Sequence, residues 1–336
     1  MIKIITLTAA KNELMISGHT ITLGVSACLL GQEVRYDGLH KRQDFIANTL
    51  AEYFEVKPLC PEVAIGLGVP RPAIQLSGDP ASPRARGVTD PGVDVTQPLR
   101  AYACEVAAAC PALSGYIFKS RSPSCGIQDV PIYPNSAEPV TTGAGIYAGT
   151  LLSRCPLLPA IDEIHLMEYA RYESFIHQVS AYHRWMLLES AGLSLQGLQE
   201  FHDAHEWLLM AHSPDNGRFL SELVAGAAET QLQDAASEYI HIFMQALRKP
   251  CSPGAHASVL SYLVREYLDA ADHDELLEVV AEYNRGVVPW NRPAASIRGQ
   301  LERLPGIDLQ RQAYLNPHPA LSLLLRQSGV AHEVIL

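Results

Sequence analysis

The sequence predicts a Rossmann-like α/β domain with a mostly parallel sheet, followed by an all-α domain. In the first half, short β-branched runs alternate with helical stretches, which is the rhythm of βαβ units. After about residue 158 the strand-like runs end, and amphipathic helical patterns follow one another. The chain has 336 residues, 48% of them hydrophobic, enough for two cores. We therefore predict domains at 1–158 and 159–336, with the boundary near Pro159.

The first domain is expected to contain strands and helices in alternation. Its predicted strands are Ile21–Ala27, Phe54–Leu59 and Gly115–Lys119, and its predicted helices are Lys41–Tyr53 and Thr96–Cys110. Between Ile65 and Pro98 there is little periodicity, which predicts a long loop. Because long loops in compact domains are usually functional or disordered, this segment is a candidate part of a site.

The second domain is expected to consist of helices alone. The predicted helices are Asp162–Leu188, Leu195–Ala211, Gly217–Leu247, Ser258–Leu268 and Asp272–Arg285. His202 and His205 lie one helical turn apart, but HEWLL is not the HExxH pattern of zinc enzymes. We interpret them as a packed or hydrogen-bonded pair in preference to a metal pair.

Hydropathy and charge indicate where in the cell the protein is located and which partners it can bind. We find no apolar run long enough to span a membrane and no apolar core of a signal peptide in Met1–Thr20, so we expect a cytoplasmic protein. Met15 is an alternative start to Met1. Residues 1–160 carry 13 Lys and Arg against 13 Asp and Glu, whereas residues 161–336 carry 12 against 23. The acidic second half repels phosphate at long range.

Three of the seven cysteines lie at the C-terminal ends of predicted strands, each just before a turn. They are Cys28 in VSACLLG, Cys60 in VKPLCPE and Cys125 in FKSRSPSCG. An odd number of cysteines without an export signal argues against a disulfide framework. Because ligands bind at the carboxyl ends of parallel strands, these thiols are candidates for one shared metal centre. Three thiolates suit a soft metal, and an iron–sulfur cube on three cysteines would leave one iron open as a Lewis acid. The alternative is that they are buried core cysteines.

Four segments in order, SACLLGQEVRYDG, LCPEVAIGLGVPRP, SRSPSCG and GAGIYAG, resemble the TudS-type thiouracil desulfidases over residues 21–155. The resemblance implies a four-iron, four-sulfur cluster on Cys28, Cys60 and Cys125, whose free iron takes the sulfur of a thiocarbonyl. It also implies a catalytic carboxylate at Glu62 and a catalytic serine at Ser122. Read alone, Glu62 is a surface charge and Ser122 a turn residue. GAGIYAG is interpreted as a tight turn beside the site or, more weakly, as a phosphate-binding turn.

Residues 163–326, with FHDAHEWLLMAHSPDNGRFL, EYNRGVVP and YLNPHP, resemble the YbgA-like helical domain. Fused to a TudS-type domain, it gives the RudS-like layout that is associated with removing 4-thiouridine from transfer RNA. This chain departs from the family pattern, because Glu206 stands where the family usually has Lys after the second histidine. CSPGAHASVL also lacks the family's basic stretch.

Arginines flank the cysteine motifs and are expected to bind a substrate phosphate, with solvated loop charges as an equal alternative. They are Arg35, Arg71, Arg84, Arg86 and Arg121. For an RNA substrate we expect a continuous basic strip from Arg71, Arg84 and Arg86 to late basic residues, and the alternative is that these cations pair with carboxylates. The late residues are Arg248, Lys249, Arg292, Arg298, Arg303 and Arg311.

The expected function is a hydrolytic, non-redox desulfidase that converts C=S to C=O in a thiolated uracil. The substrate would be 4-thiouridine in transfer RNA, free thiouracil or a thio-UMP. The alternative is a cluster-carrying sensor or binding module without turnover. The sequence leaves open the substrate's size, the role of the helical domain, the sulfur acceptor and the oligomeric state.

Overall fold

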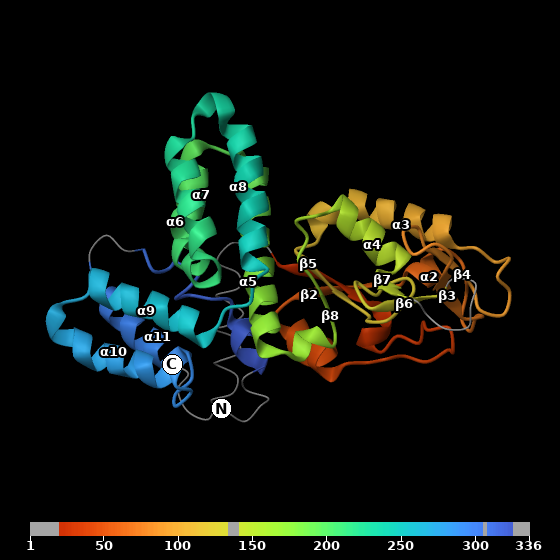
Figure 1. Ribbon diagram of the computed structural model, residues 1–336, viewed down its shortest axis with the longest axis horizontal. Coiled ribbons are helices and arrows are strands. Elements are labelled where there is room, and N and C mark those ends of the chain that lie inside the picture. The colour runs from red at the N-terminus through yellow and green to blue at the C-terminus, as the bar shows by residue number, and fades with distance from the viewer. Residues whose placement is uncertain (1–19, 134–140, 305–307, 325–336) are drawn as a thin grey trace. The chain divides into compact units, whose positions relative to one another are not determined.

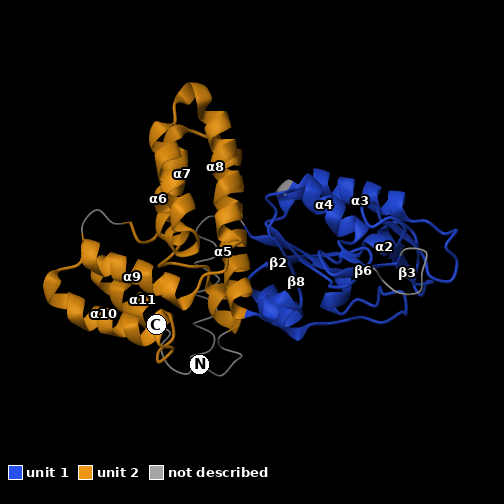
Figure 2. Cartoon of the chain, in the orientation of Figure 1, with its two compact units in different colours: residues 1–168 blue, residues 169–336 orange. Residues whose placement is uncertain are grey.

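The computed structural model describes residues 20–133, 141–304 and 308–324. The chain forms two compact units, residues 1–168 and residues 169–336 (Figures 1 and 2). The two candidate start residues, Met1 and Met15, lie outside the described residues. Each unit is described below by itself.

A four-stranded parallel sheet forms the centre of the first unit. Its strands are β1 (Thr22–Ser26), β2 (Glu55–Leu59), β5 (Gly115–Phe118) and β8 (Ala160–Asp162), in the spatial order β2-β1-β5-β8. β5 is buried along its whole length and β1 from Leu23 onward, as expected for the two middle strands of a parallel sheet. The predicted parallel α/β architecture is therefore confirmed.

A second, mixed sheet draws two of its four strands from a segment that the sequence predicted to be loop. It has the order β4-β3-β6-β7, from β3 (Ile74–Ser77), β4 (Arg84–Gly87), β6 (Val130–Tyr133) and β7 (Thr141–Gly143). The expectation of a loop over residues 65–98 was wrong for β3 and β4. β3 buries only Leu76, and β4 buries only Ala85 and Gly87, too few apolar side chains to show as alternation.

The first unit contains regular α-helices, but one of its two predicted helices is replaced by irregular helical turns. α3 (Thr96–Ala108) packs along α4 (Ile146–Arg154), and α2 (Pro61–Ala64) is a single turn (Figure 1). The helix expected over Lys41–Tyr53 is a π-helical turn, Phe45–Thr49, followed by a 3-10 turn, Leu50–Glu52. Its predicted apolar face of Phe45, Ile46 and Leu50 is nevertheless buried.

The second unit is helical, as predicted. It contains α5 (Tyr169–Ala191), α6 (Leu195–His212), α7 (Pro214–Gly226), α8 (Leu232–Leu247), α9 (Pro253–Tyr267), α10 (Ala270–Asn284) and α11 (Asn291–Leu301). The single helix expected over Gly217–Leu247 is in fact two helices, α7 and α8. Extended backbone at Ala227 and Ala228 and a 3-10 turn at Glu229–Gln231 separate them. Aromatic rings of Trp185, Phe201, Tyr239 and Phe243 pack together in its core.

His202 and His205 make separate hydrogen bonds inside this core. Nδ1 of His202 lies 3.2 Å from the Tyr239 hydroxyl, and its Nε2 lies 3.0 Å from Ser221 Oγ. Nδ1 of His205 donates to the Phe201 carbonyl at 2.6 Å. The two rings thus serve packing, in agreement with the hydrogen-bonded interpretation.

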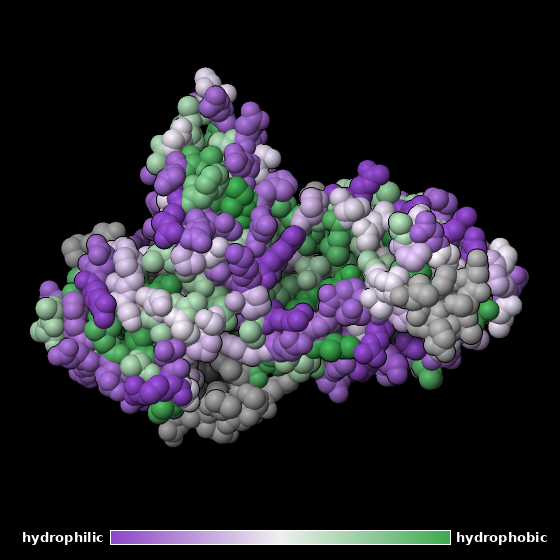
Figure 3. Space-filling view, in the orientation of Figure 1, coloured by the Kyte–Doolittle hydropathy of each residue, from purple (hydrophilic) through white to green (hydrophobic). Residues whose placement is uncertain are grey.

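The boundary between the units lies after Glu168, later than the predicted boundary near Pro159. The reason is β8, which follows Pro159 and pairs in parallel with β5. The sheet of the first unit therefore includes residues beyond the point where the sequence pattern becomes helical. No helix in the described part of the chain is long and apolar enough to cross a bilayer. On the face shown in Figure 3, hydrophilic residues are spread over both units, with apolar residues between them.

Candidate active site

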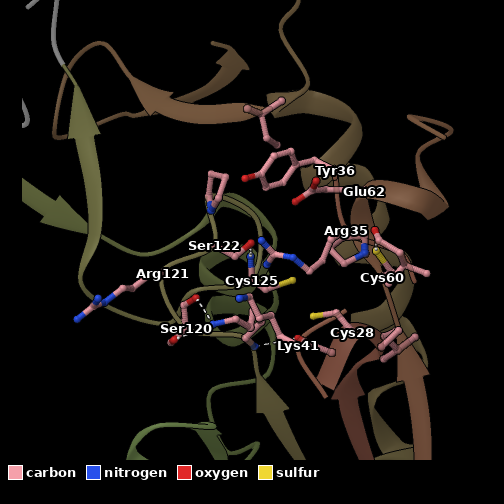
Figure 4. A pocket seen from close by; sticks show the side chains of 18 of the residues that line it. Cys28, Arg35, Tyr36, Lys41, Cys60, Glu62, Ser120, Arg121, Ser122 and Cys125 are labelled. Carbon is pink, nitrogen blue, oxygen red and sulfur yellow. Dashed lines mark hydrogen bonds between the residues drawn. The ribbon is translucent and has the colours of Figure 1, made fainter. Parts of the chain in front are cut away.

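Three neighbouring parallel strands deliver the three predicted cysteines to one cavity. Cys28 lies in the 3-10 turn that follows β1, Cys60 caps α2 directly after β2, and Cys125 lies in the loop after β5. The ends of β1 and β2 are level, because Ser26 pairs with Leu59 in the sheet register. All three cysteines line a cavity of about 400 Å³ (Figure 4).

Burial keeps the three thiols protonated when no cation is bound to them. Burial, with a smaller contribution from the neighbouring Cys60, raises the pKa of Cys28 to about 11. Burial also raises the pKa of Cys60, although the backbone amides of Val63 and Glu62 act in the opposite direction. The pKa of Cys125 lies well above its usual value because of burial, then Glu62 and the other two cysteines. The cysteines are thus close enough to influence one another electrostatically.

The donor set fits a cluster better than a single metal ion. No disulfide joins any of these cysteines. Among the described residues, three His, Cys, Asp or Glu ligand atoms lie within 4.8 Å of one another only at Glu173, Cys251 and His256, in the second unit. The sulfurs of Cys28, Cys60 and Cys125 are therefore spread more widely than the ligands of one ion. A cluster of several irons accepts such a spread, because each thiolate binds a different iron.

Glu62 lies on the wall of the same cavity, where Arg71 and Ser124 bind its carboxylate. Arg71 forms an ion pair with Glu62 Oε2, its Nη2 at 2.8 Å and its Nε at 2.9 Å. Ser124 Oγ donates to Glu62 Oε1 at 2.9 Å. The Glu62 side chain is 14% exposed, so it is neither a free surface charge nor sealed from the cavity.

Ser122 shapes the loop that carries Cys125. Its Oγ accepts hydrogen bonds from the backbone amides of Cys125 at 3.1 Å and Ser124 at 3.3 Å. Its carbonyl accepts from the amide of Gly126 at 2.8 Å. Ser122 also lines the cavity, so the turn role and the predicted contact with substrate are compatible.

The GAGIYAG segment braces this loop from behind. The amides of Ile146 and Ala148, in the first turn of α4, donate to the carbonyls of Pro123 and Ser124, both at 3.0 Å. A Cβ on Gly145 would lie 2.6 Å from the backbone of Ser124. The segment is thus a close backbone approach beside the site, and its amides bind the loop where a phosphate-binding turn would leave them free.

Sequence reasoning missed a buried polar group at the end of β5. Lys119 Nζ forms an ion pair with Glu163 Oε1 at 2.5 Å, and Ser120 donates through both its amide and its hydroxyl to Glu163, at 2.7 Å each. Lys119 and Ser120 line the cavity. The signal was available for Lys119, the last residue of a predicted strand, but Glu163 lay in the segment assigned to the helical domain.

The structure brings three of the five predicted substrate-binding arginines to the cavity. Arg35 and Arg121 line it beside Arg71, although Arg121 extends away from the sulfurs in Figure 4. Arg84 and Arg86 are not among its lining residues, and both form ion pairs with Asp94, at 2.7 and 3.2 Å. Arg71 is committed to Glu62 and to the carbonyls of Gly68 and Val34.

Several arginines expected in a basic strip pair with carboxylates. Besides those just described, Arg298 pairs with Glu302 at 2.9 Å. Arg311 pairs with Glu200 and Asp308, at 3.1 and 3.3 Å. For these residues the alternative outcome, pairing in place of a free basic surface, is the one observed.

Two known families match the chain, one in each unit. The family described as 2-thiouracil desulfurase matches residues 23–163, and a family described as a protein of unknown function (DUF1722) matches residues 207–319.

Individual relatives also match only part of the chain each. YbbK of Bacillus subtilis (strain 168), an uncharacterised protein, is 34% identical over 138 residues, which cover 38% of this chain and 87% of YbbK. YbgA of Escherichia coli (strain K12), also uncharacterised, is 27% identical over 162 residues, 47% of this chain and 95% of YbgA. A solved structure, the [4Fe-4S]-dependent thiouracil desulfidase TudS, is 33% identical, with 44% of this chain and 94% of that chain covered and a TM-score of 0.35.

Proposed function

The chain belongs to the 2-thiouracil desulfurase family through its first unit, and from this premise we propose that it removes sulfur from a thiolated uracil with a four-iron, four-sulfur cluster. The observation that carries the proposal is the convergence of Cys28, Cys60 and Cys125 on one cavity beside Glu62. These three cysteines are the proposed cluster ligands. Bound there, the cluster supplies one iron without a protein ligand, a Lewis acid for sulfur.

The proposed reaction exchanges sulfur for oxygen without a change in oxidation state. The carbon–sulfur bond of the thiocarbonyl breaks and a carbon–oxygen bond to water forms, and both protons of the water leave with the sulfur as hydrogen sulfide. Glu62 is the proposed acid–base group. Its Oε1 accepts one hydrogen bond from Ser124, and a carboxylate oxygen has two acceptor positions, so one position is left for the attacking water.

The surroundings of Glu62 suit this role. Arg71 binds Oε2 and Ser124 binds Oε1, so rotation of the carboxylate would break hydrogen bonds at both oxygens. Arg35 and Lys119 both act to lower the pKa of Cys28, which places two cations where thiolates bound to a cluster would need charge compensation.

Tyr36 is the proposed stacking surface for the pyrimidine ring. It lines the cavity and is 44% exposed, and the guanidinium of Arg35 lies 5.4 Å from its ring centroid (Figure 4). Aromatic side chains hold an unstacked base by ring stacking, worth about 1–3 kcal/mol per base. A free thiouracil, a thio-UMP and a flipped 4-thiouridine of transfer RNA all present the same ring to this wall.

The test follows the thiocarbonyl absorbance with anaerobically reconstituted protein. Free 4-thiouracil, thio-UMP and 4-thiouridine-containing transfer RNA are tested in parallel, with released sulfide measured alongside. We expect loss of absorbance and stoichiometric sulfide with at least one substrate, and no reaction with Cys125→Ala protein. A protein that holds its cluster but turns over none of the three would be a sensor or binding module, and the proposal would fail.

A further inference from the structure

A second group of metal-binding side chains lies inside the helical unit, separate from the cysteine cavity. Glu173 comes from α5, Cys251 from the segment between α8 and α9, and His256 from α9. All three side chains are buried, and one ligand atom of each lies within 4.8 Å of the others. From these residues we propose that the second unit binds one divalent transition metal ion, with zinc as the best fit, through Glu173, Cys251 and His256.

The geometry suits zinc. Tetrahedral zinc sites with bonds of about 2.0–2.3 Å hold their ligand atoms roughly 3.5 Å apart. Nε2 of His256 already lies 3.3 Å from Glu173 Oε2. Thiolate, imidazole and carboxylate are all ordinary zinc ligands, and a mixed set with one thiolate disfavours magnesium and calcium, which prefer oxygen. Three protein ligands leave one tetrahedral position for a water molecule.

Charge balance also favours a dication. One thiolate, one carboxylate and a neutral imidazole carry two negative charges, which a single Zn²⁺ neutralises. Without a cation, the core buries the Glu173 carboxylate with the His256 imidazole as its ion-pair partner, an arrangement that is costly in a core.

A hydrogen bond at the far nitrogen orients the proposed histidine ligand. Nδ1 of His256 lies 3.1 Å from the hydroxyl of Tyr314, and that hydroxyl lies 3.5 Å from the His256 carbonyl. Donation from Nδ1 to the phenol oxygen leaves the Nε2 lone pair facing Glu173 and Cys251. Metal-binding histidines are usually held in this way by a second group.

The proposed metal would join three separate segments of the unit, so we expect its binding to stabilise the unit. Tryptophan fluorescence isolates this unit, because the chain's three tryptophans, Trp185, Trp207 and Trp290, all belong to it. Trp290 lies close to the site, with Nε1 donating to the Tyr314 hydroxyl at 3.5 Å. The fluorescence melting curve therefore reports loss of the metal in the second unit without interference from the cysteine cavity.

The experiment uses the full chain equilibrated with Zn²⁺ and then freed of excess metal. We expect Cys251→Ser to contain one zinc per chain less than the unchanged protein, and Cys104→Ser, at an exposed cysteine of the first unit, to lose none. Chelation should lower the fluorescence melting temperature of the unchanged protein and of Cys104→Ser by several degrees, and Zn²⁺ should restore it.

Two results would overturn the proposal. One is equal zinc content in folded Cys251→Ser and the unchanged protein. The other is a fluorescence melting curve of the unchanged protein that neither chelation nor added Zn²⁺ moves. The second measurement needs no variant, so it decides the question even if Cys251→Ser does not fold.

Discussion

Glu62 accepts hydrogen bonds on both carboxylate oxygens. Replacing one of these oxygens should abolish its acid–base role and leave cluster binding intact. Glu62→Gln keeps the size of the side chain but removes its charge and basicity. We expect turnover to fall by about a hundredfold or more, the usual contribution of an acid–base group, with iron content unchanged. Iron and sulfide analysis beside the absorbance assay checks both parts, and an active variant would remove Glu62 from the mechanism.

Ser124 should act through Glu62. It is fully buried, and its hydroxyl donates to Glu62 Oε1. A hydrogen bond to a charged group contributes about 1.5–3 kcal/mol, so Ser124→Ala should lower kcat roughly tenfold to a hundredfold by releasing one side of the carboxylate. Ser153→Ala, at an exposed position on α4, is the matched control. An unchanged kcat and pH profile in Ser124→Ala would show that Arg71 alone positions Glu62.

The three cavity cysteines should each be needed for iron. Cys28→Ala, Cys60→Ala or Cys125→Ala removes one of only three proposed ligands, so reconstituted protein should lose most of its iron and acid-labile sulfide. Cys104→Ala, at an exposed residue of α3, should keep both. Full iron retention in any one of the first three variants would exclude that cysteine as a ligand.

At the scale of elements, the sequence predicted the parallel strands better than the second sheet. β1, β2 and β5 were predictable because short runs with β-branched or aromatic residues, each followed by a turn, mark strands. β3 and β4 were not, since each has four residues and lies in a segment rich in Pro and Gly. The cysteines could be placed at strand ends from the sequence. The bonds from Arg71 and Ser124 to Glu62 could not, because they depend on how the loops fold back on each other.

Two glycines of the GAGIYAG segment should respond oppositely to the same change. A Cβ on Gly145 would lie 2.6 Å from the backbone of Ser124 and 2.8 Å from the Ser122 carbonyl, so Gly145→Ala must displace the loop that carries Cys125. A Cβ on Gly149, within α4, would meet only the Ala144 side chain at 3.4 Å. We expect Gly145→Ala to lose cluster occupancy and most activity.

Gly149→Ala should keep both and gain up to about 1 kcal/mol of stability from helix propensity. Iron content and a denaturant titration compare the two variants directly. Equal iron content in both would contradict the inference that close backbone approach at Gly145 sets the position of the cysteine loop.

At the scale of the whole molecule, buried histidines should make the second unit sensitive to acid. Burial lowers the pKa of His205 and His318 to about 3, and that of His212 to about 4. Below the unfolded value of about 6.5, the unfolded chain takes up protons that the native unit cannot. The free energy of unfolding should therefore fall by roughly 1 kcal/mol per histidine for each pH unit between about 6.5 and 4.

Denaturant titrations followed by tryptophan fluorescence at pH 7.5, 6.5 and 5.5 measure this slope. His318→Gln should make the slope shallower, whereas His241→Gln, at an exposed position, should leave it unchanged. A free energy of unfolding that is constant from pH 7.5 to 5.5 would contradict the lowered pKa values.

Glu163 has a consequence for how such two-part chains can arise by recombination. It lies beyond the point where the sequence pattern becomes helical. Its two carboxylate oxygens nevertheless accept hydrogen bonds from Lys119 and Ser120, which follow β5 in the segment before Cys125. A crossover placed at Pro159 would exchange β8 and Glu163 for foreign sequence and leave Lys119, a partly buried cation, without its counter-ion. A crossover between Glu163 and the start of α5 keeps β8 and Glu163 with the cysteine cavity, so we expect exchange of the second unit to leave the first unit functional only with a junction in or after this segment.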